Sequence, residues 1–567
     1  MWPSVKFCKA RGGMERVIFV NEGEPVCARL AGFGLDCHLG YIYLGPGRDF
    51  VYGDRGVGSG DFRIQARLSL HKPPEHQGFV QMSKEDESNA AFCFSGGDFY
   101  RGGENELKVS GFVPPEVRRH SRFGFGHEGR IYVDGPLFGG LKLLDAVNSF
   151  IPAERLFDFE VARTGSRLRF LLDGQVAYET TFDEKLFGKV GFTAGRGVMR
   201  LRDFEAHGNT YDLDWQRSQP VGYTIPVIDV ADQQQRQVVV ARGSESIDYQ
   251  HPTTVLLQDG RTIVCPWTHG HGGALGPMKR SQDGGLTWQW VKTPEDWTEV
   301  QNCPTIHRLT DRDGVERLIV LGGKDGSMMQ AVSEDLGITW NGMHPTGLSC
   351  TVPPITIEPI SDGRHLALFH AGRSIFMSVT GDGGLTWSEQ QKIAEERDAY
   401  LCEPAIIRSP DGKQLATVMR ENSRWYNSYI MLSNDEGATW SSPEELPGSL
   451  SGDRHMARYD EDGRIVMVFR DTCICSRTAA DFVGWVGTYD DLVEKREGQY
   501  RVRLIANSRY AHAGYTGYPG LERLPDGTFV ATTYAVIEKG HRASIVSVRF
   551  TLSEIDGIAS DQEGVAV

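Results

Sequence analysis

Apolar and polar positions alternate strictly along several stretches in the first third of the chain. The clearest stretch is residues 62–70, FRIQARLSL, and an Asp173-Gly174 turn separates two others. A period of two is typical of strands that bury one face. The alternating stretches are residues 62–70, 157–161, 167–171, 175–178, 189–194 and 199–206. We therefore predict an all-β domain over residues 1–210, built as a β-sandwich.

From residue 211 to 567 the pattern changes to short apolar strands on both sides of an Asp-Gly turn, which is a hairpin signature. The turn occurs at Asp259-Gly260, Asp313-Gly314, Asp362-Gly363, Asp411-Gly412, Asp462-Gly463 and Asp526-Gly527. Six hairpins at intervals of 49–64 residues predict a β-propeller of six four-stranded blades. We expect residues 543–552 and 224–230 to close the ring together.

A second repeat, S/T-x-D-x-G-x-T-W, occurs four times within the same region. Its copies are residues 281–288, 333–340, 380–387 and 433–440. The Asp can accept turn N–H groups, the Gly can take a positive φ, and the Trp can pack between sheets. The pattern resembles the Asp box of sialidase-type propellers. The resemblance implies a structural role for these segments and no part in catalysis.

Length and composition restrict the function. A chain of 567 residues suits two or three domains. The net charge of −15 argues against a nucleic-acid partner. No stretch approaches the roughly 20 apolar residues of a membrane span, so we expect no membrane partner. The first 20 residues lack a clear signal peptide. We expect a cytoplasmic protein as written, or a secreted or periplasmic one if a leader was removed.

The Asp of each Asp-Gly turn is a fixed reference from which equivalent positions on the innermost strands can be counted, and the entry ends of these strands line one mouth of a propeller. We call the position eight residues before this Asp the ruler position. Eight residues before the turn Asp lie His251, Glu403, Arg454 and Tyr518 in four different hairpins. A purely structural strand would prefer Val or Ile at this position. Four polar or reactive residues at one geometrical position indicate a functional site.

Two of these segments resemble sialidases residue by residue, within a resemblance that covers about residues 224–556. Residues 402–407, followed by Arg420, are similar to the segment with the catalytic Glu and the second carboxylate-binding Arg. Residues 517–521 are similar to the segment with the nucleophilic Tyr. The resemblance implies that Glu403 takes the proton of Tyr518, whose phenolate attacks the anomeric carbon. A base is needed because free Tyr has a pKa of about 10.

Arginines are implied by the same resemblance to hold the carboxylate of the sugar, since planar guanidinium forks suit this bidentate task. Arg420 matches the second family arginine. Arg470 ends the strand of the next hairpin as Arg420 ends its own, and Arg477 better matches the expected place of the third arginine. Arg454, at the ruler position, is a further candidate for substrate binding.

The sequence departs from the family at two points. Gln250 stands where the first arginine is expected, and His251 follows it. The family's acid/base Asp is also missing, and residues 267–273 read WTHGHGG in its place. Histidine is a plausible acid or base near neutral pH. We take His251 as a catalytic candidate and Gln250 and His269 as substrate-binding candidates. The general acid stays open among His251, His269, His271, Asp229 and Asp248.

The first domain resembles concanavalin or laminin-G domains over residues 58–208, which suggests either glycan binding or a scaffold for the propeller. The pairs His269-x-His271 and Cys473-x-Cys475 lack a second pair at zinc spacing. We therefore expect neither a metal nor a cofactor.

The leading hypothesis is an exo-acting glycoside hydrolase, an exo-α-sialidase that releases terminal sialic acid from glycoconjugates. A first alternative is a glycosidase or lyase for another acidic sugar, such as a uronic or keto-deoxy acid. A second is a non-catalytic glycan-binding protein, since fold alone does not decide function. The expected partner is the terminal acidic sugar of a glycan. The linkage, the stereochemical outcome and the oligomeric state stay open.

Overall fold

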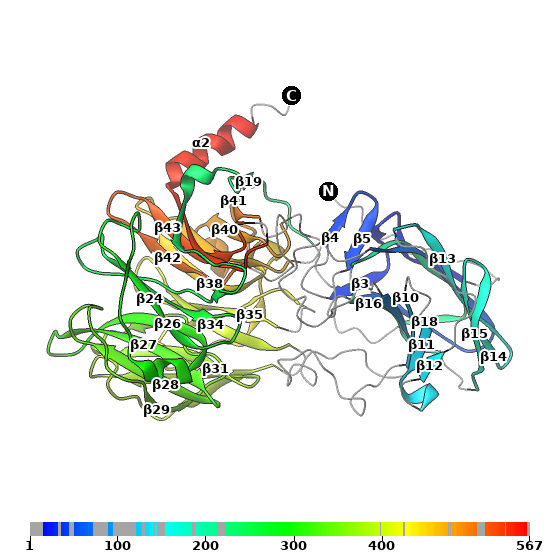
Figure 1. Cartoon of the computed structure of the whole chain (residues 1–567), viewed down its shortest axis with the longest axis horizontal. Coiled ribbons are helices and arrows are strands. Elements are labelled where there is room, and N and C mark those ends of the chain that lie inside the picture. The colour runs from blue at the N-terminus through cyan, green and yellow to red at the C-terminus, as the bar shows by residue number, and fades with distance from the viewer. Residues whose placement is uncertain are drawn as a thin grey trace. The chain divides into compact units, whose positions relative to one another are not determined.

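The chain is all-β in the computed structural model (Figure 1), as predicted. The structure describes residues 15–31, 36–44, 50–71, 89–94, 121–126, 131–139, 142–144, 154–183, 187–196, 198–212, 222–396, 399–422, 426–473, 476, 478–506, 516–538 and 540–563. The chain forms two compact units, Met1–Val221 and Gly222–Val567, with residues 423–425 and 474–479 grouped with the first. None of the described helices is long and apolar enough to span a membrane.

The first unit contains two large antiparallel sheets. The larger sheet is β15 (Gln175–Thr181), β14 (Arg167–Leu172), β13 (Phe157–Thr164), β8 (Phe62–His71), β17 (Val198–Gly208), β1 (Glu15–Asn21) and β2 (Glu24–Pro25), with β5 (Tyr41–Leu44) on β17 and β4 (Asp36–His38) on β5. The other is β12 (Lys142–Leu144), β11 (Ile131–Asp134), β10 (Ser121–Gly126), β9 (Asn89–Phe94), β16 (Val190–Arg196), β6 (Phe50–Gly53) and β3 (Ala28–Ala31). A small sheet pairs β18 (Thr210–Asp212) with β7 (Arg55–Val57). The alternating stretches of the sequence form β8, β13, β14, β15, β16 and β17.

Phenylalanine side chains join the two large sheets in one core. The ring of Phe92 on β9 lies 5.2 Å from that of Phe159 on β13, and Phe123 on β10 stacks on Phe170 of β14 at 4.5 Å. All four side chains are buried. Aromatic pairs at these separations add to the free energy of apolar burial. The inward-facing half of each alternating strand therefore supplies the core of this unit.

The second unit contains six small sheets among its described residues, which we number 1 to 6 along the chain. Sheets 1 to 3 are β21 (Tyr249–Gln250), β22 (Val255–Leu256), β23 (Ile263–His269), β24 (Leu275–Ser281) and β25 (Gln289–Trp290); β26 (Gln301–Thr310), β27 (Glu316–Lys324), β28 (Ser327–Ser333) and β29 (His344–Ser349); and β30 (Ile357–Pro359), β31 (His365–Ala371), β32 (Ser374–Thr380) and β33 (Gln391–Glu395).

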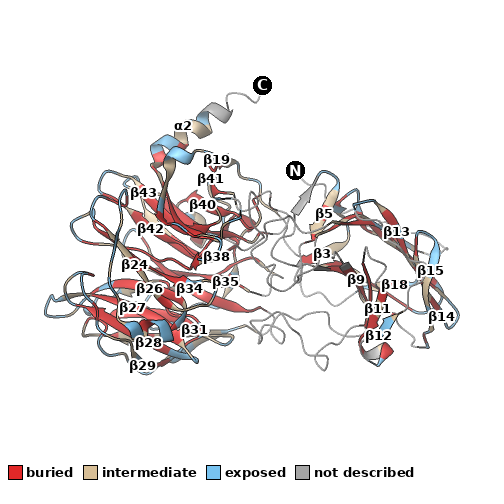
Figure 2. Ribbon diagram, in the orientation of Figure 1, coloured by how far each residue is buried: buried red, intermediate tan, exposed pale blue. Residues whose placement is uncertain are grey.

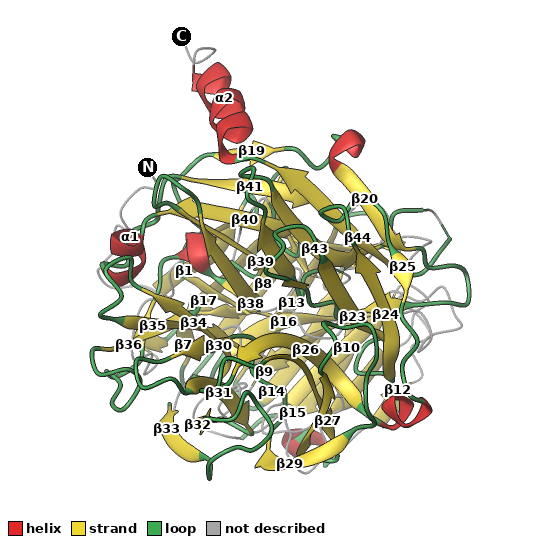
Figure 3. Cartoon of the chain, turned by 90° about the vertical axis from the view of Figure 1, so that its left-hand side faces the viewer, coloured by secondary structure: helices red, strands yellow, loops and turns green. Residues whose placement is uncertain are grey.

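Sheets 4 to 6 continue the series. They are β34 (Leu401–Arg408), β35 (Leu415–Glu421), β36 (Tyr429–Ser433) and β37 (Glu444–Glu445); β38 (Gly452–Tyr459), β39 (Ile465–Asp471), β40 (Phe482–Gly487), β41 (Tyr500–Ile505) and β19 (Val227–Asp229); and β42 (Gly520–Arg523), β43 (Phe529–Ala535), β44 (Ser544–Phe550) and β20 (Gln237–Ala241). These sheets are antiparallel except for one parallel pair in sheet 5, β19 with β41. Helices α1 (Tyr489–Val493) and α2 (Leu552–Glu563) lie outside the strands (Figure 3).

The six sheets surround one cavity. Each Asp-Gly turn joins the first strand of a sheet to the next strand, and the glycine of every such turn has a positive φ. A cavity of about 650 Å³ is lined by residues of β22, β26, β30, β34, β38 and β42, one strand from each sheet, including Val255, His307, Glu358, Arg408 and Glu522. Figure 2 shows buried residues concentrated in the strands and exposed residues in the outer loops. The first strands are therefore the innermost ones.

The pairing of the final strand differs from the prediction. Ser544–Phe550 pairs with β20, Gln237–Ala241, in sheet 6, whereas β19 joins sheet 5 by pairing in parallel with β41. Residues 224–230 therefore do not share a sheet with the final strand. The chain turns between them, where Asp229 Oδ1 accepts the N–H of Ala231. The β-branched run Val238–Val240 then supplies the pairing strand, as its composition favours.

The four S/T-x-D-x-G-x-T-W segments connect the last two strands of sheets 1 to 4. In the first segment, Asp283 Oδ1 accepts the backbone N–H of Thr287 at 2.9 Å and Asp283 Oδ2 accepts its hydroxyl at 2.5 Å. The same bonds recur at Asp335, Asp382 and Asp435. Each carboxylate thus stabilises the turn that leads into the outermost strand of its sheet, away from the innermost strand.

Candidate active site

The four residues at the ruler position share one unusual backbone conformation. The φ angle is 51° at His251, 49° at Glu403, 55° at Arg454 and 54° at Tyr518. This conformation costs a non-glycine residue of order 1–2 kcal/mol, so the surrounding structure must enforce it. The strand register shifts beside Glu403 and beside Arg454. A bulge of this kind redirects a side chain, and here it redirects Glu403 and Arg454 near the entry of their strands.

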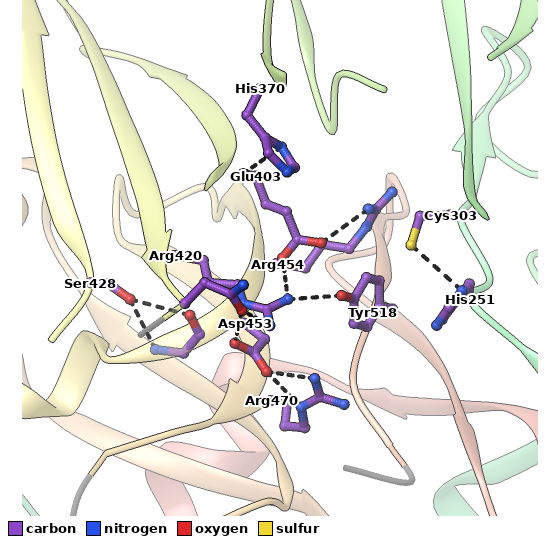
Figure 4. Close-up of polar contacts among 12 residues, drawn as sticks. His251, Cys303, His370, Glu403, Arg420, Ser428, Asp453, Arg454, Arg470 and Tyr518 are labelled. Atoms are coloured by element: carbon purple, nitrogen blue, oxygen red, sulfur yellow. Dashed lines mark hydrogen bonds and ion pairs between the residues drawn. The ribbon is translucent and has the colours of Figure 1, made fainter. Parts of the chain in front are cut away.

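Arg420 connects the two residues of the predicted nucleophile–base pair. Its Nη1 donates to Glu403 Oε2 at 2.9 Å and to Tyr518 Oη at 2.8 Å. Its Nη2 donates to Asn422 Oδ1. Figure 4 shows the carboxylate of Glu403 and the hydroxyl of Tyr518 converging on this guanidinium. The structure therefore brings Glu403, Arg420 and Tyr518 together, as the resemblance implied.

Asp453 is a buried carboxylate between two of the arginines. Its Oδ1 forms an ion pair with Arg420 Nε at 2.8 Å, and its Oδ2 accepts from Nε of Arg470 at 2.8 Å. Nη1 of Arg470 also donates to the backbone oxygen of Thr516 at 2.9 Å and to Tyr534 Oη at 3.3 Å. Most of the donors of Arg470 are thus engaged within the protein.

The guanidinium of Arg454 is placed differently. It lies over the ring of Tyr518, 5.1 Å from the ring centroid, and its Nη1 is 3.6 Å from Glu403 Oε1. Neither of these two atoms makes a hydrogen bond within the described part of the chain. Arg454 and Glu403 are both only 1% exposed. Two buried, charged atoms without hydrogen bonds face each other here, a costly arrangement unless a ligand or water completes it.

The charges of the described residues in this cluster do not balance. Glu403 and Asp453 oppose the guanidiniums of Arg420, Arg454 and Arg470, which gives these five side chains a net charge of +1 in a buried region. The neighbouring histidine does not add to it, because burial, with help from nearby cations, lowers the pKa of His251 well below its usual value. An excess buried positive charge favours the binding of an anion.

The protonation states of the pair are also set by the cluster. Burial and the charge of Glu403 raise the pKa of Tyr518 well above its usual value. Burial by itself would raise the pKa of Glu403, but the guanidiniums of Arg420 and Arg454 hold it below its ordinary value. In the unliganded protein, Tyr518 is therefore a neutral phenol and Glu403 an ionised carboxylate.

His251 borders the cluster and belongs to a second chain of contacts. Its ring lies 4.5 Å from the ring of Tyr518. Its Nε2 is 3.1 Å from Nδ1 of His271, and its Nδ1 is 3.5 Å from Sγ of Cys303. His251 and Cys303 are buried, whereas His271 is exposed. Of the histidines in the WTHGHGG segment, the structure thus connects His271 to the site.

The other predicted site residues lie apart from this cluster. Gln250 is buried on β21, where its amide donates to Asp248 Oδ2 at 2.9 Å. His269 is exposed at the end of β23 and packs beside the ring of Tyr249 at 5.4 Å. Asp229 forms an ion pair with Arg503 on the outermost strand of sheet 5, at the opposite edge from Arg454. Arg477 lies outside the described residues.

Sequence reasoning missed four residues of the site. Asp453 lies one position before Arg454, and counting back nine residues from the turn Asp, instead of eight, would have found it. Cys303 precedes a proline, as His251, Glu403 and Tyr518 do, so a search for residues before proline would have found it. Tyr534 lies inside β43 and carries no signal in the sequence. His370, whose Nδ1 faces the backbone N–H of Glu403 at 3.3 Å, carries none either.

Comparison with known proteins gives one family match and several structural ones. The family model of a BNR repeat-like domain matches residues 370–467. That range contains Glu403, Arg420 and Arg454, together with the S/T-x-D-x-G-x-T-W segments of sheets 3 and 4. No curated protein matches the chain in sequence.

Several solved structures are similar to the chain at low identity. A protein of unknown function from Dyadobacter fermentans has 17% identity and a TM-score of 0.43, covering 55% of this chain and 97% of that one. The NanB sialidase of Streptococcus pneumoniae has 11% identity and a TM-score of 0.41, covering 88% and 96%. The Trypanosoma rangeli sialidase has 14% identity and a TM-score of 0.39, covering 57% and 60%. With TM-scores below 0.5 these likenesses carry no argument about activity, so the function must be argued from the site.

Proposed function

We propose that the chain is an exo-acting glycosidase that releases a terminal acidic sugar from glycans, with sialic acid as the first candidate. The observation that carries the proposal is the buried cluster beside Tyr518, whose five described charged side chains have a net charge of +1. An acidic sugar would bring the missing negative charge. The glycosidic bond next to its carboxylate would then lie beside the phenol and the carboxylate that could cleave it.

We also propose that sheets 1 to 6 are the blades of a six-bladed β-propeller and that the large sheets of the first unit form a lectin-like sandwich. The cavity lined by all six innermost strands supports the propeller. Contacts between the first strands of sheets 4 and 5, and of sheets 5 and 6, support a closed ring. The core of phenylalanines shared between the two large sheets supports the sandwich.

Arg454 is the residue that would receive the carboxylate of the sugar. Its Nη1 lacks a hydrogen bond in the described protein, whereas Nη1 of Arg470 donates to Thr516 and Tyr534 and its Nε to Asp453. We therefore assign Arg470 to holding Asp453, which in turn orients Arg420. Arg420 and Arg454 would then form the clamp, and no arginine is required at position 250.

The chemistry would follow from the same contacts. The oxygen of Tyr518 forms a bond to the anomeric carbon, its proton passes to Glu403, and the bond from that carbon to the leaving oxygen breaks as this oxygen takes up a proton. Water then gives up a proton and attacks the anomeric carbon, the bond from that carbon to Tyr518 breaks, the sugar departs, and Glu403 returns the first proton to Tyr518. A neutral phenol suits this position because a carboxylate nucleophile would be repelled by the carboxylate of the sugar.

Substrate binding would also prepare the proton transfer. In the unliganded protein the pKa of Tyr518 is raised and that of Glu403 is lowered, so the transfer is uphill. A sugar carboxylate that draws Arg454 and Arg420 toward itself removes positive charge from Glu403. The pKa of Glu403 then rises and the carboxylate becomes a stronger base. The acidic group of the substrate is thus a requirement of the mechanism as well as of recognition.

The test is the release of free sugar from a mixed panel of sialosides, glucuronides and neutral glycosides. We expect release from an acidic member only, and loss of release in Tyr518→Phe. Tyr489→Phe, in helix α1 at the outside of sheet 5, is the matched control and should keep full activity. Retention of a glycan without release by the wild-type protein would overturn the enzyme and favour the glycan-binding alternative.

A further inference from the structure

The contacts of Asn302 fix the direction of a hydrogen-bond chain at the edge of the site. Asn302 has a φ of 66°, and its Nδ2 donates to the backbone oxygen of Thr351 at 2.7 Å. The other end of the amide, Oδ1, is therefore the atom that faces Sγ of Cys303 at 3.2 Å. A carbonyl oxygen can only accept. The single proton of the Cys303 thiol must point to Asn302.

The tautomers of two histidines follow from that proton. Because the thiol proton of Cys303 is committed, Sγ can only accept from Nδ1 of His251, 3.5 Å away. Nδ1 of His251 therefore carries the hydrogen, and Nε2 has the lone pair. Nδ1 of His271, 3.1 Å from that lone pair, must donate to it. The proton that His271 can gain or lose at its ring is thus the one on Nε2.

One of the two histidines is buried and the other is exposed to solvent. His251 is 1% exposed and stays neutral, since burial, His271 and the guanidiniums of Arg454, Arg470 and Arg420 all lower its pKa. His271 is exposed, between two glycines of positive φ, Gly270 at 73° and Gly272 at 62°. The rings of Tyr518 and Tyr534 also contact His251. An exposed imidazole is therefore tied, through one buried ring, to the proposed nucleophile.

We propose that His271 is the general acid of the reaction and that His251, Cys303 and Asn302 are positioning residues that fix its tautomer. The inference rests on the glycosidase function proposed above. The imidazolium of His271 gives the proton on Nε2 to the glycosidic oxygen while the bond to the anomeric carbon breaks. The neutral imidazole then takes a proton from the water that attacks the glycosyl–Tyr518 intermediate, which restores the imidazolium.

Neutral His251 would act on His271 as a carboxylate acts on the histidine of a catalytic dyad. A hydrogen-bond acceptor at Nδ1 holds the ring in one orientation and stabilises its protonated form. A carboxylate there would add a negative charge close to the anionic substrate. A neutral acceptor performs the same task without that repulsion, which fits a site that selects an acidic sugar.

The experiment compares substrates that differ only in their leaving group. The aryloxide of an aryl sialoside leaves without protonation, whereas the leaving oxygen of sialyl-lactose needs a proton. A matched pair of glucuronides, one aryl and one unactivated, is assayed in parallel. For His271→Ala we expect kcat/KM on the unactivated substrate to fall about 10²–10⁴-fold, with less than about tenfold loss on the aryl substrate. His251→Phe keeps a ring beside Tyr518 but removes the acceptor, and should show the same selectivity with a smaller loss.

His344→Ala is the control, since His344 lies on β29, the fourth strand of sheet 2, bonded to Gln330. It should leave both rates unchanged, and thermal melts check the fold of every variant. Equal losses on the two substrates in His271→Ala, or no loss, would overturn the acid assignment while leaving the glycosidase intact. Failure of the wild-type protein to cleave either substrate of either pair would instead overturn the proposed function and the acid with it.

Discussion

At the residue scale, the site depends on how each guanidinium distributes its donors. Arg420 divides one nitrogen between Glu403 and Tyr518, and Arg470 is bound to Asp453 and to the backbone of Thr516. Arg454 has a buried nitrogen without a hydrogen bond in the described chain. Three arginines of one cluster therefore have three different tasks, and substitutions should separate them.

Tyr518→Phe and Glu403→Gln test the proposed nucleophile and base. Each should lower turnover by orders of magnitude while the melting temperature barely changes, because both replacements keep the shape of the side chain. The double variant should be little worse than either single one, since residues that act as a unit are not additive. Kinetics on an aryl sialoside and melts of all three variants provide the measurement. A well-folded Tyr518→Phe with near wild-type turnover would favour an inverting mechanism with water as the nucleophile.

Arg454→Lys and Arg470→Lys distinguish the substrate clamp from its support. Lysine cannot form a fork, so Arg454→Lys should raise KM for the acidic substrate about 10–100-fold, of the order seen when one partner of a buried charge pair is lost. Its melting temperature should stay close to that of the parent. Arg470→Lys loses bonds to Thr516 and Tyr534 and should melt lower. The reverse pattern would assign the clamp to Arg470.

At the element scale, a turn repeated four times provides an internal comparison. In all four S/T-x-D-x-G-x-T-W segments, the residue after the Asp has a positive φ, which is 71° at Gly284, 59° at Leu336, 71° at Gly383 and 59° at Glu436. Two copies thus carry a side chain in a conformation that glycine adopts without steric cost. The bonds of the carboxylate enforce it there.

Leu336→Gly should stabilise the protein. Leu336 is 39% exposed, so little apolar burial is lost. Relief of the left-handed backbone conformation should outweigh the greater conformational entropy that glycine loses on folding, by about 0.5–1 kcal/mol. Glu436→Gly removes the same strain but also the ion pair with Arg408 at 2.9 Å, and should gain less. Urea unfolding of both variants measures the difference. A loss of stability in Leu336→Gly would show that the turn is not strained there.

At the scale of the whole molecule, buried histidines of four sheets predict how stability varies with pH. Burial lowers the pKa of His307 to about 3 and those of His370 and His455 to about 4, and it also lowers the pKa of His251 well below its usual value. Below pH 6.5 the unfolded chain binds protons that the folded protein excludes. Stability should therefore be full above pH 6.5 and fall as the pH drops toward 4.

The measurement is denaturant unfolding at pH 7.5, 6 and 5. Each histidine contributes a slope of up to about 1.4 kcal/mol per pH unit. His307→Gln, which can still donate to the backbone oxygen of Pro354 that His307 Nε2 faces at 3.2 Å, should flatten the profile. An unchanged slope in that variant would mean that His307 is protonated in the folded state.

The unbalanced charge of the cluster also predicts a ligand effect on the whole molecule. A ligand that binds only the folded state stabilises it by about 2.7 kcal/mol at one hundred times its Kd. Free sialic acid or glucuronic acid should therefore raise the melting temperature, and galactose should not. The shift should vanish in Arg454→Met, which keeps the length of the side chain without its charge. A shift of the same size with galactose would contradict charge recognition.

The sequence by itself determined the all-β class, the six hairpins and the position of four site residues. These features are local, because an alternating strand and an Asp-Gly turn are specified by residues that are neighbours in the chain. The ruler worked because every hairpin has the same length from its entry to its turn. It located His251, Glu403, Arg454 and Tyr518 without knowledge of how the sheets are arranged.

The tertiary structure alone decided which of these residues meet and what each can donate. Asp453 of sheet 5 binds Arg420 of sheet 4 as well as Arg470 of its own sheet. Cys303 of sheet 2, whose thiol faces Asn302, sets the tautomer of His251 in the segment between β21 and β22 of sheet 1. Glu403 and Tyr518 are brought to one guanidinium although more than one hundred residues separate them. Spacing along a chain fixes the geometry within a hairpin, but contacts between hairpins depend on the packing of whole sheets, which no local pattern encodes.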